Sequence, residues 1–227
     1  MVKAVVFDLD DTLYMENEFV EYGLKNAANV AETVYGIVNA NEKIRSLYQE
    51  SKANVFDRLV NAEKIKDKEI AVAGLVKAYR NCEPKNLHCN PGVLDLLKTL
   101  KKKGVRTGII TDGFADVQKS KIKALGIQEY IDKIVITDEL GGVQCRKPNP
   151  IGFEKMLKML DVKPQEMVYI GDNPNKDFAI KKYLPIITAR VDVPNGIYRN
   201  SEYLYGIKPD IIVKQIGDIL QDERLFG

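Results

Sequence analysis

The sequence has few of the residues on which many protein functions depend. It contains one histidine and three cysteines among 227 residues. Because Cys82, Cys89 and Cys145 are odd in number and widely spaced, they indicate neither a disulfide framework nor a zinc site. We therefore expect a protein of a reducing cytoplasm. The histidine, His88, lies near two prolines, and we interpret it as a surface or hinge residue rather than a catalytic group.

Long apolar runs and an excess of either charge are also missing. No apolar segment of the sequence is long enough to cross a bilayer. Residues 2–7 are too short for a signal peptide and lead directly into aspartates. The formal net charge is +2, from 34 basic and 32 acidic side chains. We therefore expect neither nucleic acid nor a membrane surface as a partner.

The composition is otherwise that of a folded globular protein. Hydrophobic residues make up 45% of the chain and charged residues 29%, which fits a soluble globule rather than a disordered chain. A chain of 227 residues can form one ordinary domain, or a main domain with a modest insertion.

Residues 16–81 differ in character from the rest of the chain. Glycine and proline are scarce there, and apolar residues recur at the spacing of amphipathic helices. The last of these apolar stripes contains Ile70, Ala73, Val76 and Tyr79. We predict three or four helices packed on each other, followed by a return linker at residues 82–92, which contain two prolines and a glycine.

From residue 92 onward, helical segments alternate with short strand-like runs. In addition to residues 4–7, we expect strands at about residues 105–110, 134–136, 167–170, 186–191 and 211–213. Helices are expected at about 92–103, 115–125 and 150–160, and a closing helix from about residue 215. Asn149 is the expected N-cap of the third of these helices, with Pro150 in its first turn. This alternation predicts an α/β fold, with a parallel sheet covered by helices on both faces.

Three of the expected strands end in similar polar residues. Asp8 and Asp10 follow the first strand, Thr111 and Asp112 the second, and Asp172 with Asp177 a later one. Because parallel strands end at one edge of a sheet, these groups can converge. Carboxylates gathered in one place repel each other unless a cation lies among them. Oxygen ligands without histidine or cysteine favour Mg²⁺.

Four short motifs resemble, in order, those of the haloacid dehalogenase superfamily. They are FDLDDTL at residues 7–13, ITDG at 110–113, RKPNP at 146–150 and GDNPNKD at 171–177. The similarity is to the phosphatase branch that carries a C1-type helical cap after the first motif. It implies a Rossmann-like, three-layer catalytic core of residues 1–14 and 88–227, with a helical cap domain over residues 15–87.

The resemblance also implies catalytic roles. Asp8 would be the nucleophile that forms an aspartyl-phosphate intermediate. Asp10 would protonate the leaving oxygen and then activate water. Thr111 and Lys147 would hold the phosphoryl oxygens and stabilise their developing charge.

A Mg²⁺ site is implied at the same place. Its ligands would be the carboxylates of Asp8 and Asp172 and the backbone carbonyl of Asp10. Asp177 would be a ligand, directly or through water, or would orient Lys147.

Several neighbouring residues have plainer alternatives. Asp112 and Gly113 are candidates for phosphate binding, but both can equally make an ordinary turn. Asp11 is interpreted as a helix-start or turn residue, and Asp138 as a solvated loop residue. Tyr14, directly after the first motif, is a candidate to contact substrate.

Asp10 bears on the kind of reaction. Dehalogenases of this superfamily lack an aspartate there, because a halide leaves without a proton. We therefore expect a Mg²⁺-dependent phosphatase that hydrolyses a small phosphorylated metabolite, either a sugar phosphate or a nucleoside monophosphate. The alternatives are a phosphomutase of the same superfamily and, less favoured by the intact motifs, a non-catalytic binding protein.

Overall fold

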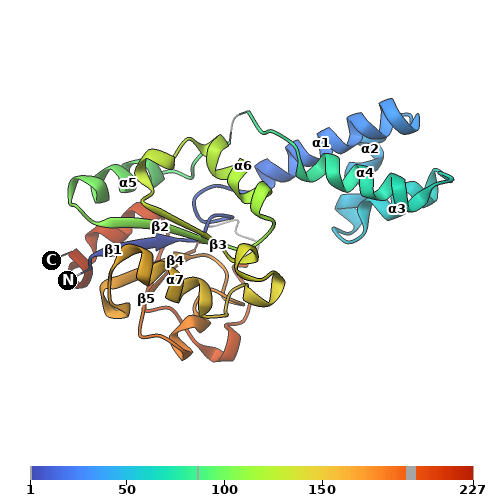
Figure 1. The fold of residues 1–227 in the computed structure, drawn as a ribbon. Coiled ribbons are helices and arrows are strands. Elements are labelled where there is room, and N and C mark those ends of the chain that lie inside the picture. Colours follow the sequence, from blue (N-terminus) through green and yellow to red (C-terminus); the bar gives the residue numbers. More distant parts are fainter. Residues whose placement is uncertain (1, 86, 193–197, 227) are drawn as a thin grey trace. The chain divides into compact units, whose positions relative to one another are not determined.

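The computed structural model describes residues 2–85, 87–192 and 198–226 (Figure 1). The chain divides into two compact units. One comprises Met1–Met15 and Asn86–Gly227, and the other comprises Glu16–Lys85. Among the described residues, no helix is both long enough and apolar enough to cross a membrane. The roles of the two units, catalytic core and cap, stay predictions.

The first unit is built on a parallel sheet of six strands in the order β3-β2-β1-β4-β5-β6. The strands are β1 (Ala4–Phe7), β2 (Arg106–Thr111), β3 (Lys133–Ile136), β4 (Met167–Gly171), β5 (Ile187–Val191) and β6 (Ile211–Val213). Every residue of β1 is fully buried, because this strand pairs with β2 and β4 on its two sides. Burial on both faces explains why β1 is a continuous apolar run rather than an alternating one. The predicted parallel α/β fold is confirmed.

Helices cover both faces of the sheet, which makes three layers (Figure 1). Helices α5 (Val93–Lys102) and α6 (Ala115–Leu125) lie on one side, and α7 (Ile151–Leu160) lies on the other. Phe153, Met156 and Leu160 of α7 form a buried cluster with side chains of β1 and β4. These residues recur at helical spacing on one face of α7.

Some helix boundaries differ from expectation. Helix α5 lies one residue inside the predicted range at each end. Helix α7 begins at Ile151, one residue later than predicted, although the Asn149 Oδ1 still accepts the Ile151 N–H at 3.0 Å. The closing segment is a 3₁₀ turn at Ile216–Gln221 followed by the short helix α8 (Glu223–Phe226). A glycine and two aspartates, which are weak helix formers, occur in residues 216–222.

The second unit consists of four helices, as the sequence predicted. They are α1 (Glu16–Tyr35), α2 (Ala40–Glu50), α3 (Val55–Ala62) and α4 (Lys68–Arg80). Their buried side chains form one cluster, to which α1 contributes Val20, Leu24, Ala27, Ala28 and Ala31. The unit therefore has an apolar core of its own.

The face that α4 buries is only partly the predicted one. Val76 and Tyr79 pack against the core cluster, but Ile70 is 70% exposed, whereas Ala71 and Leu75 are completely buried. The prediction was wrong at Ile70 because part of the contact face of α4 consists of small residues, which carry little apolar signal. Gly74 is an example, since a Cβ there would lie 2.5 Å from the Tyr35 hydroxyl of α1. Close packing of α1 and α4, rather than side-chain hydrophobicity alone, selects this face.

Candidate active site

The candidate site lies where β1, β2 and β4 end. These strands are adjacent in the sheet, so the residues that follow them share one edge. Asp8 directly follows β1, and its backbone N–H donates to the Ile170 carbonyl at 2.8 Å. The strand pairing thus continues through the first motif residue and fixes its position.

Three carboxylates come together at this edge. Asp8, Asp172 and Asp177 each place an oxygen within 4.8 Å of the others, and their exposed fractions are 2%, 6% and 0%. Burial and mutual repulsion both oppose ionisation of such a group. Asp172 is held by the Thr12 hydroxyl, which donates to its Oδ1 at 3.5 Å.

Lys147 is the cation within this group. Its Nζ lies 2.7 Å from the Asp8 Oδ1 and 2.9 Å from the Asp177 Oδ1, and it donates to the Tyr169 hydroxyl at 2.7 Å. Burial by itself lowers the pKa of Lys147, but the charges of Asp177 and Asp8 outweigh it, and the pKa is raised. Lys147 therefore remains an ammonium group between two carboxylates.

Lys147 and its neighbour Lys176, whose Nζ lies 3.8 Å from the Asp8 Oδ2, do not balance three buried acids. Burial raises the pKa of Asp172 to about 9, with further contributions from the charges of Asp177, Asp8 and Asp11. Burial also raises the pKa of Asp8 to about 6, although Lys147 and Lys176 act against it. An additional cation would relieve this repulsion, and the hard oxygen donors of Asp8, Asp172 and Asp177 suit Mg²⁺. The residues present thus fit the metal that the resemblance implied.

The side chain of Asp10 lies outside the three-carboxylate group. Its two oxygens lie 2.7 and 2.9 Å from the Lys121 Nζ, and its Oδ1 accepts a hydrogen bond from the Tyr14 hydroxyl at 2.5 Å. The backbone carbonyl of Asp10, the atom expected from the resemblance, therefore stays the candidate metal ligand of this residue.

Asp112 anchors the loop that carries Lys147. Its Oδ1 accepts the Lys147 backbone N–H at 3.1 Å and the Thr137 hydroxyl at 2.8 Å, and its Oδ2 lies 3.2 Å from the Lys176 Nζ. Burial favours the neutral acid, but the charges of Lys147 and Lys176 together with these hydrogen bonds lower the pKa of Asp112. Asp112 is therefore an ionised residue that holds the Lys147 loop in place. Its contact with phosphate stays a prediction.

The other residues expected to bind phosphate adjoin α6. The Thr111 hydroxyl donates to the Gln118 Oε1 at 3.1 Å. Gly113 has a φ of 126°, and a Cβ there would lie 2.8 Å from the Gln118 Nε2. The positive φ therefore favours a glycine, and a Cβ at this position would also displace the Gln118 amide. Binding of phosphate by either residue stays a prediction.

Asp138 is not the solvated loop residue that we expected. Its side chain is only 13% exposed, and its two oxygens accept 2.7 Å hydrogen bonds from the Nε and an Nη of Arg146. The hydrogen bond to Arg146 is the main reason why the pKa of Asp138 is lowered. This pair of hydrogen bonds fixes Arg146, the residue before Lys147. The arginine in the RKPNP motif was the sequence signal that could have predicted a partner for Asp138.

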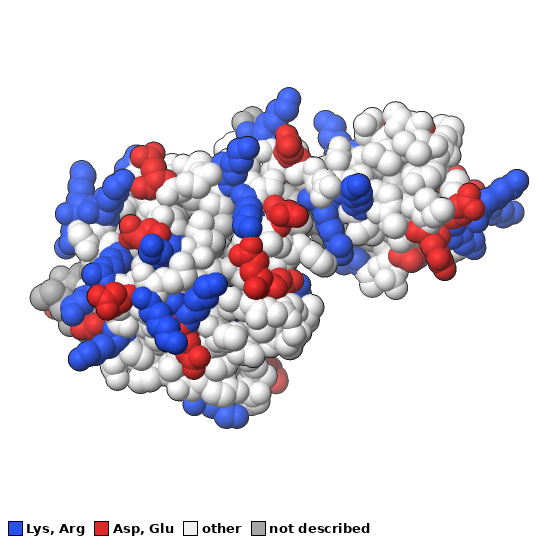
Figure 2. Space-filling view, in the orientation of Figure 1, with Lys and Arg blue, Asp and Glu red and all other residues white. Residues whose placement is uncertain are grey.

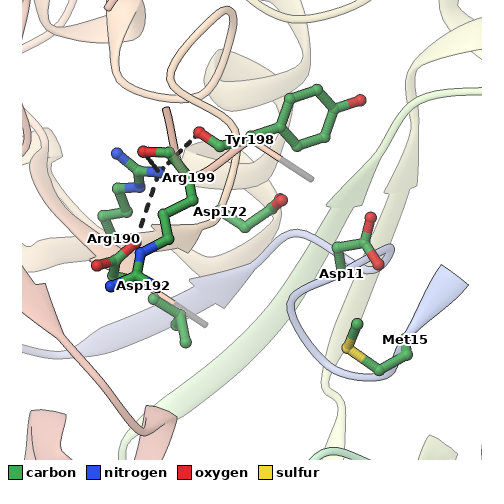
Figure 3. Close-up of a pocket in the computed structure, with 8 residues that line it drawn as sticks. Asp11, Met15, Asp172, Arg190, Asp192, Tyr198 and Arg199 are labelled. Carbon is green, nitrogen blue, oxygen red and sulfur yellow. Dashed lines mark hydrogen bonds and ion pairs between the residues drawn. The ribbon is translucent and has the colours of Figure 1, made fainter. Parts of the chain in front are cut away.

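Asp11 occupies a left-handed turn, with a φ of 54°. Figure 3 shows it beside a small pocket, which is also lined by Met15, Asp172, Arg190, Val191, Asp192, Tyr198 and Arg199. The Arg190 guanidinium donates to the Tyr198 carbonyl and the Tyr203 hydroxyl, each at 2.9 Å. These bonds give Arg190 a structural role at the end of β5.

Three residues of the site were missed by sequence reasoning. The Lys176 Nζ lies 3.8 Å from the Asp8 Oδ2, and the charge of Asp8, with those of Asp177 and Asp112, raises the pKa of Lys176 well above its usual value in spite of burial. The Tyr169 hydroxyl donates to the Asp177 Oδ1 at 3.2 Å as well as binding Lys147. The third is Lys121. Two of these residues had a sequence signal, because Lys176 lies inside the GDNPNKD motif and Tyr169 carries a hydroxyl in a buried strand. No local feature of the sequence indicates that Lys121 belongs to the site.

Comparison with known proteins agrees with this arrangement. A sequence model of the haloacid dehalogenase-like hydrolases matches residues 2–180, and a second model, described as HAD-hydrolase-like, matches residues 144–219. The chain belongs to the haloacid dehalogenase-like hydrolase family. The resemblance of the four motifs is thereby confirmed, and the chain is a hydrolase by family.

Curated relatives in this family span nearly the whole chain. A glyceraldehyde 3-phosphate phosphatase of Methanocaldococcus jannaschii is 33% identical over 209 residues, which are 89% of this chain and 89% of the relative. The pyrophosphatase PpaX of Halalkalibacterium halodurans is 29% identical over 223 residues, covering 96% of this chain and 95% of the relative. Among solved structures, a haloacid dehalogenase superfamily hydrolase of subfamily IA from Geobacter sulfurreducens superposes with a TM-score of 0.69. It is 19% identical, with 97% of this chain and 95% of that chain covered. At that identity, the solved structure supports the fold alone.

Proposed function

We propose that this hydrolase is a Mg²⁺-dependent phosphatase acting on a small phosphomonoester through an aspartyl-phosphate intermediate on Asp8. The observation that carries the proposal is the position of Asp8. Its buried carboxylate adjoins Lys147, Asp172 and Asp177 at the end of a central strand. Such a site combines a carboxylate nucleophile with the positive charge that an anionic substrate requires.

The nucleophile is held in one orientation. The Asp8 Oδ1 accepts the Leu9 backbone N–H at 2.8 Å and lies 2.7 Å from the Lys147 Nζ. Phosphoryl transfer depends chiefly on in-line positioning and on neutralisation of charge. We infer that these two contacts orient the carboxylate for attack on phosphorus.

Two lysines and a metal would balance the charge of the substrate. Lys147 and Lys176 lie on the two oxygens of Asp8, at 2.7 and 3.8 Å, where they can stabilise developing charge on the phosphoryl oxygens. Mg²⁺ bound by Asp8, Asp172, Asp177 and the Asp10 carbonyl would neutralise the carboxylates and the transferring group.

Asp10 is the proposed proton carrier. It would protonate the leaving oxygen when the phosphoryl group moves to Asp8, and would then remove a proton from the water that hydrolyses the intermediate. A carbon–halogen bond needs no such acid, so the presence of Asp10 favours phosphate esters over haloacids.

The curated relatives support one substrate class over the other. Those named above act, by their names, on glyceraldehyde 3-phosphate and on pyrophosphate. We therefore place a small sugar phosphate ahead of a nucleoside monophosphate, with the helical unit Glu16–Lys85 as a cap that excludes water and selects the substrate. None of the three cysteines forms a disulfide in the described part of the chain, and we place the reaction in a reducing cytoplasm.

Phosphate release from a panel of esters tests this proposal. The panel contains glyceraldehyde 3-phosphate, larger sugar phosphates, nucleoside monophosphates and pyrophosphate, each with and without Mg²⁺. We expect the wild-type protein to release phosphate from a small sugar phosphate when Mg²⁺ is present. Asp8→Asn should lower kcat by roughly 10³-fold or more, because an amide cannot form the acyl phosphate.

The matched control is Asp161→Asn, because the Asp161 side chain is 97% exposed. This variant should retain full activity and the same melting temperature. An Asp8→Asn variant that folds and keeps near wild-type turnover would overturn the proposed mechanism.

A further inference from the structure

Helix α6 buries polar side chains where apolar ones are expected. Its buried residues are Gln118, Lys121, Ile122 and Leu125, which recur at the spacing of a single helical face. Two of these four positions are therefore polar on the face that packs against the core. Each of the two polar side chains contacts a residue of the sequence motifs, because Gln118 accepts from Thr111 and Lys121 contacts Asp10.

Lys121 is almost completely withdrawn from solvent. Its side chain is 3% exposed, whereas that of Asp10 is 21% exposed. A buried ammonium group is unfavourable unless a carboxylate pairs with it. The pair is therefore asymmetric. The lysine is enclosed by protein, and the carboxylate keeps one side accessible to a reacting molecule.

The contact restricts the carboxylate strongly. The Lys121 Nζ lies 2.7 Å from the Asp10 Oδ1 and 2.9 Å from the Oδ2, and the Tyr14 hydroxyl donates to the Oδ1 at 2.5 Å. Charge-assisted bonds to both oxygens of a carboxylate fix its plane as well as its position. The side chain of Asp10 is thus oriented by α6, while the nucleophile Asp8 is oriented by Lys147.

We infer that Lys121 is a positioning residue for the Asp10 carboxyl group. It holds this group where its protonated form can donate the proton to the leaving oxygen, and Lys121 then pairs with the carboxylate that the transfer leaves on Asp10. The inference rests on the proposed function, in which Asp10 is the general acid. An acid must lie within hydrogen-bond reach of the oxygen that it protonates. Loss of Lys121 should therefore slow those reactions that need this proton and spare those that do not.

Two phosphate esters separate these cases. Glyceraldehyde 3-phosphate has an alkoxide leaving group, which requires a proton as its bond to phosphorus breaks. 4-Nitrophenyl phosphate has a nitrophenolate leaving group, which departs without one. The value of kcat/KM reports only the steps up to cleavage of the bond between phosphorus and the leaving oxygen. It therefore measures the role of Asp10 as an acid, separately from its later activation of water.

The test compares Lys121→Met with Asp10→Asn, both with Mg²⁺. Both variants should lower kcat/KM for glyceraldehyde 3-phosphate, by about 10- to 100-fold for Lys121→Met, and lower it by less than about 3-fold for 4-nitrophenyl phosphate. Lys121→Arg, which retains donors for both oxygens, should recover part of the alkyl-ester activity. Adding Lys121→Met to Asp10→Asn should cause no further loss, because Lys121 acts through Asp10.

The matched control is Lys119→Met on the same helix. Lys119 forms an exposed pair with Glu139 at 2.6 Å, so this variant also removes one lysine–carboxylate contact and should leave both activities unchanged. Melting temperatures of all variants show whether each one folds.

Failure of the inference and failure of the proposed function give different results. If Asp10→Asn is selective for the alkyl ester but Lys121→Met lowers both activities equally, Lys121 is merely structural and the inference is overturned. An additional loss in the double variant overturns it as well. If the wild-type protein hydrolyses neither ester, or if Asp10→Asn shows no selectivity, the proposed function fails and the inference fails with it.

Discussion

At the scale of single residues, the acids of the site differ in the groups that surround them. Asp8 lies 2.7 Å from the Lys147 ammonium, whereas Asp172 accepts a 3.5 Å hydrogen bond from the neutral Thr12 hydroxyl. Burial raises the pKa of both, but to about 6 for Asp8 and to about 9 for Asp172. The two acids therefore differ in how readily they ionise, although both are buried at the same edge of the sheet.

The raised pKa of Asp172 predicts how stability depends on pH without metal. Between its ordinary pKa of 3.8 and the folded value of about 9, the folded protein holds a proton that the unfolded chain has lost. The free energy of unfolding therefore falls as pH rises across this range. Asp172→Asn removes this pH-dependent loss of stability, because an amide does not ionise. The metal-free variant should therefore melt a few degrees above the wild-type protein at pH 8.

Mg²⁺ should act in the opposite direction. Because the metal replaces the proton on Asp172, its binding tightens as pH rises, and its effect on the melting temperature should grow between about pH 6 and pH 9. The shift should be lost in Asp172→Asn and kept in Asp161→Asn. Calorimetry at several pH values measures both effects, and an unchanged melting temperature at millimolar Mg²⁺ would contradict the metal assignment.

At the scale of secondary-structure elements, small residues determine how closely helices approach. In α1, a Cβ on Gly23 would lie 2.5 Å from the Tyr79 ring of α4 and 3.1 Å from the Tyr79 carbonyl oxygen. The backbone oxygen cannot move aside as easily as a flexible side chain. This glycine therefore permits the contact between α1 and α4 on which the helical unit depends.

Gly23→Val should destabilise the helical unit by about 2 kcal/mol, because the added side chain overpacks the interface. Denaturant unfolding followed by circular dichroism measures this loss. Lys25→Val is the matched control, since Lys25 is exposed on the same helix, and its effect should stay within about 0.5 kcal/mol. Equal stabilities of the two variants would show that the interface tolerates a larger residue at position 23.

At the scale of the whole molecule, the residues of the candidate site all belong to one unit. Asp8, Lys147, Asp172 and Asp177 lie in Met1–Met15 and Asn86–Gly227. The segments that lead into and out of the helical unit also pair with each other there, since the Asn90 N–H donates to the Leu13 carbonyl at 2.8 Å. These four site residues therefore all come from the unit that contains the parallel sheet.

A chain in which a short Gly-Ser linker replaces residues 16–85 should fold and keep the Mg²⁺-dependent rise in melting temperature. If the helical unit is the cap that we propose, turnover of small esters should fall by about 10-fold or more, because the proposed exclusion of water would be lost. Thermal melts with and without Mg²⁺, together with phosphate release, measure both properties. A folded variant without a Mg²⁺ response would show that the helical unit contributes to the metal site.

Charges of both signs occur together on the face of the molecule that Figure 2 shows. The formal net charge is +2. The expectation that neither nucleic acid nor a membrane surface is a partner stays a prediction.

The sequence by itself determined the α/β fold and the residues that follow β1, β2 and β4. Apolar runs and helical periodicity are local properties, and parallel strands necessarily end at one edge. The strand ends therefore predicted that Asp8 and Asp172 could converge, and the resemblance of the motifs implied that both bind one Mg²⁺ ion.

Only the tertiary structure decided which cations and hydrogen-bond donors serve these acids. Lys121 pairs with Asp10, which lies 111 positions away in the chain. Tyr169 accepts a hydrogen bond from Lys147, although the sequence of its strand indicates only a buried apolar strand. The buried face of α4 was likewise selected by close packing against α1. These pairings depend on which distant side chains the fold brings within hydrogen-bond distance, and no local pattern in the sequence encodes that distance.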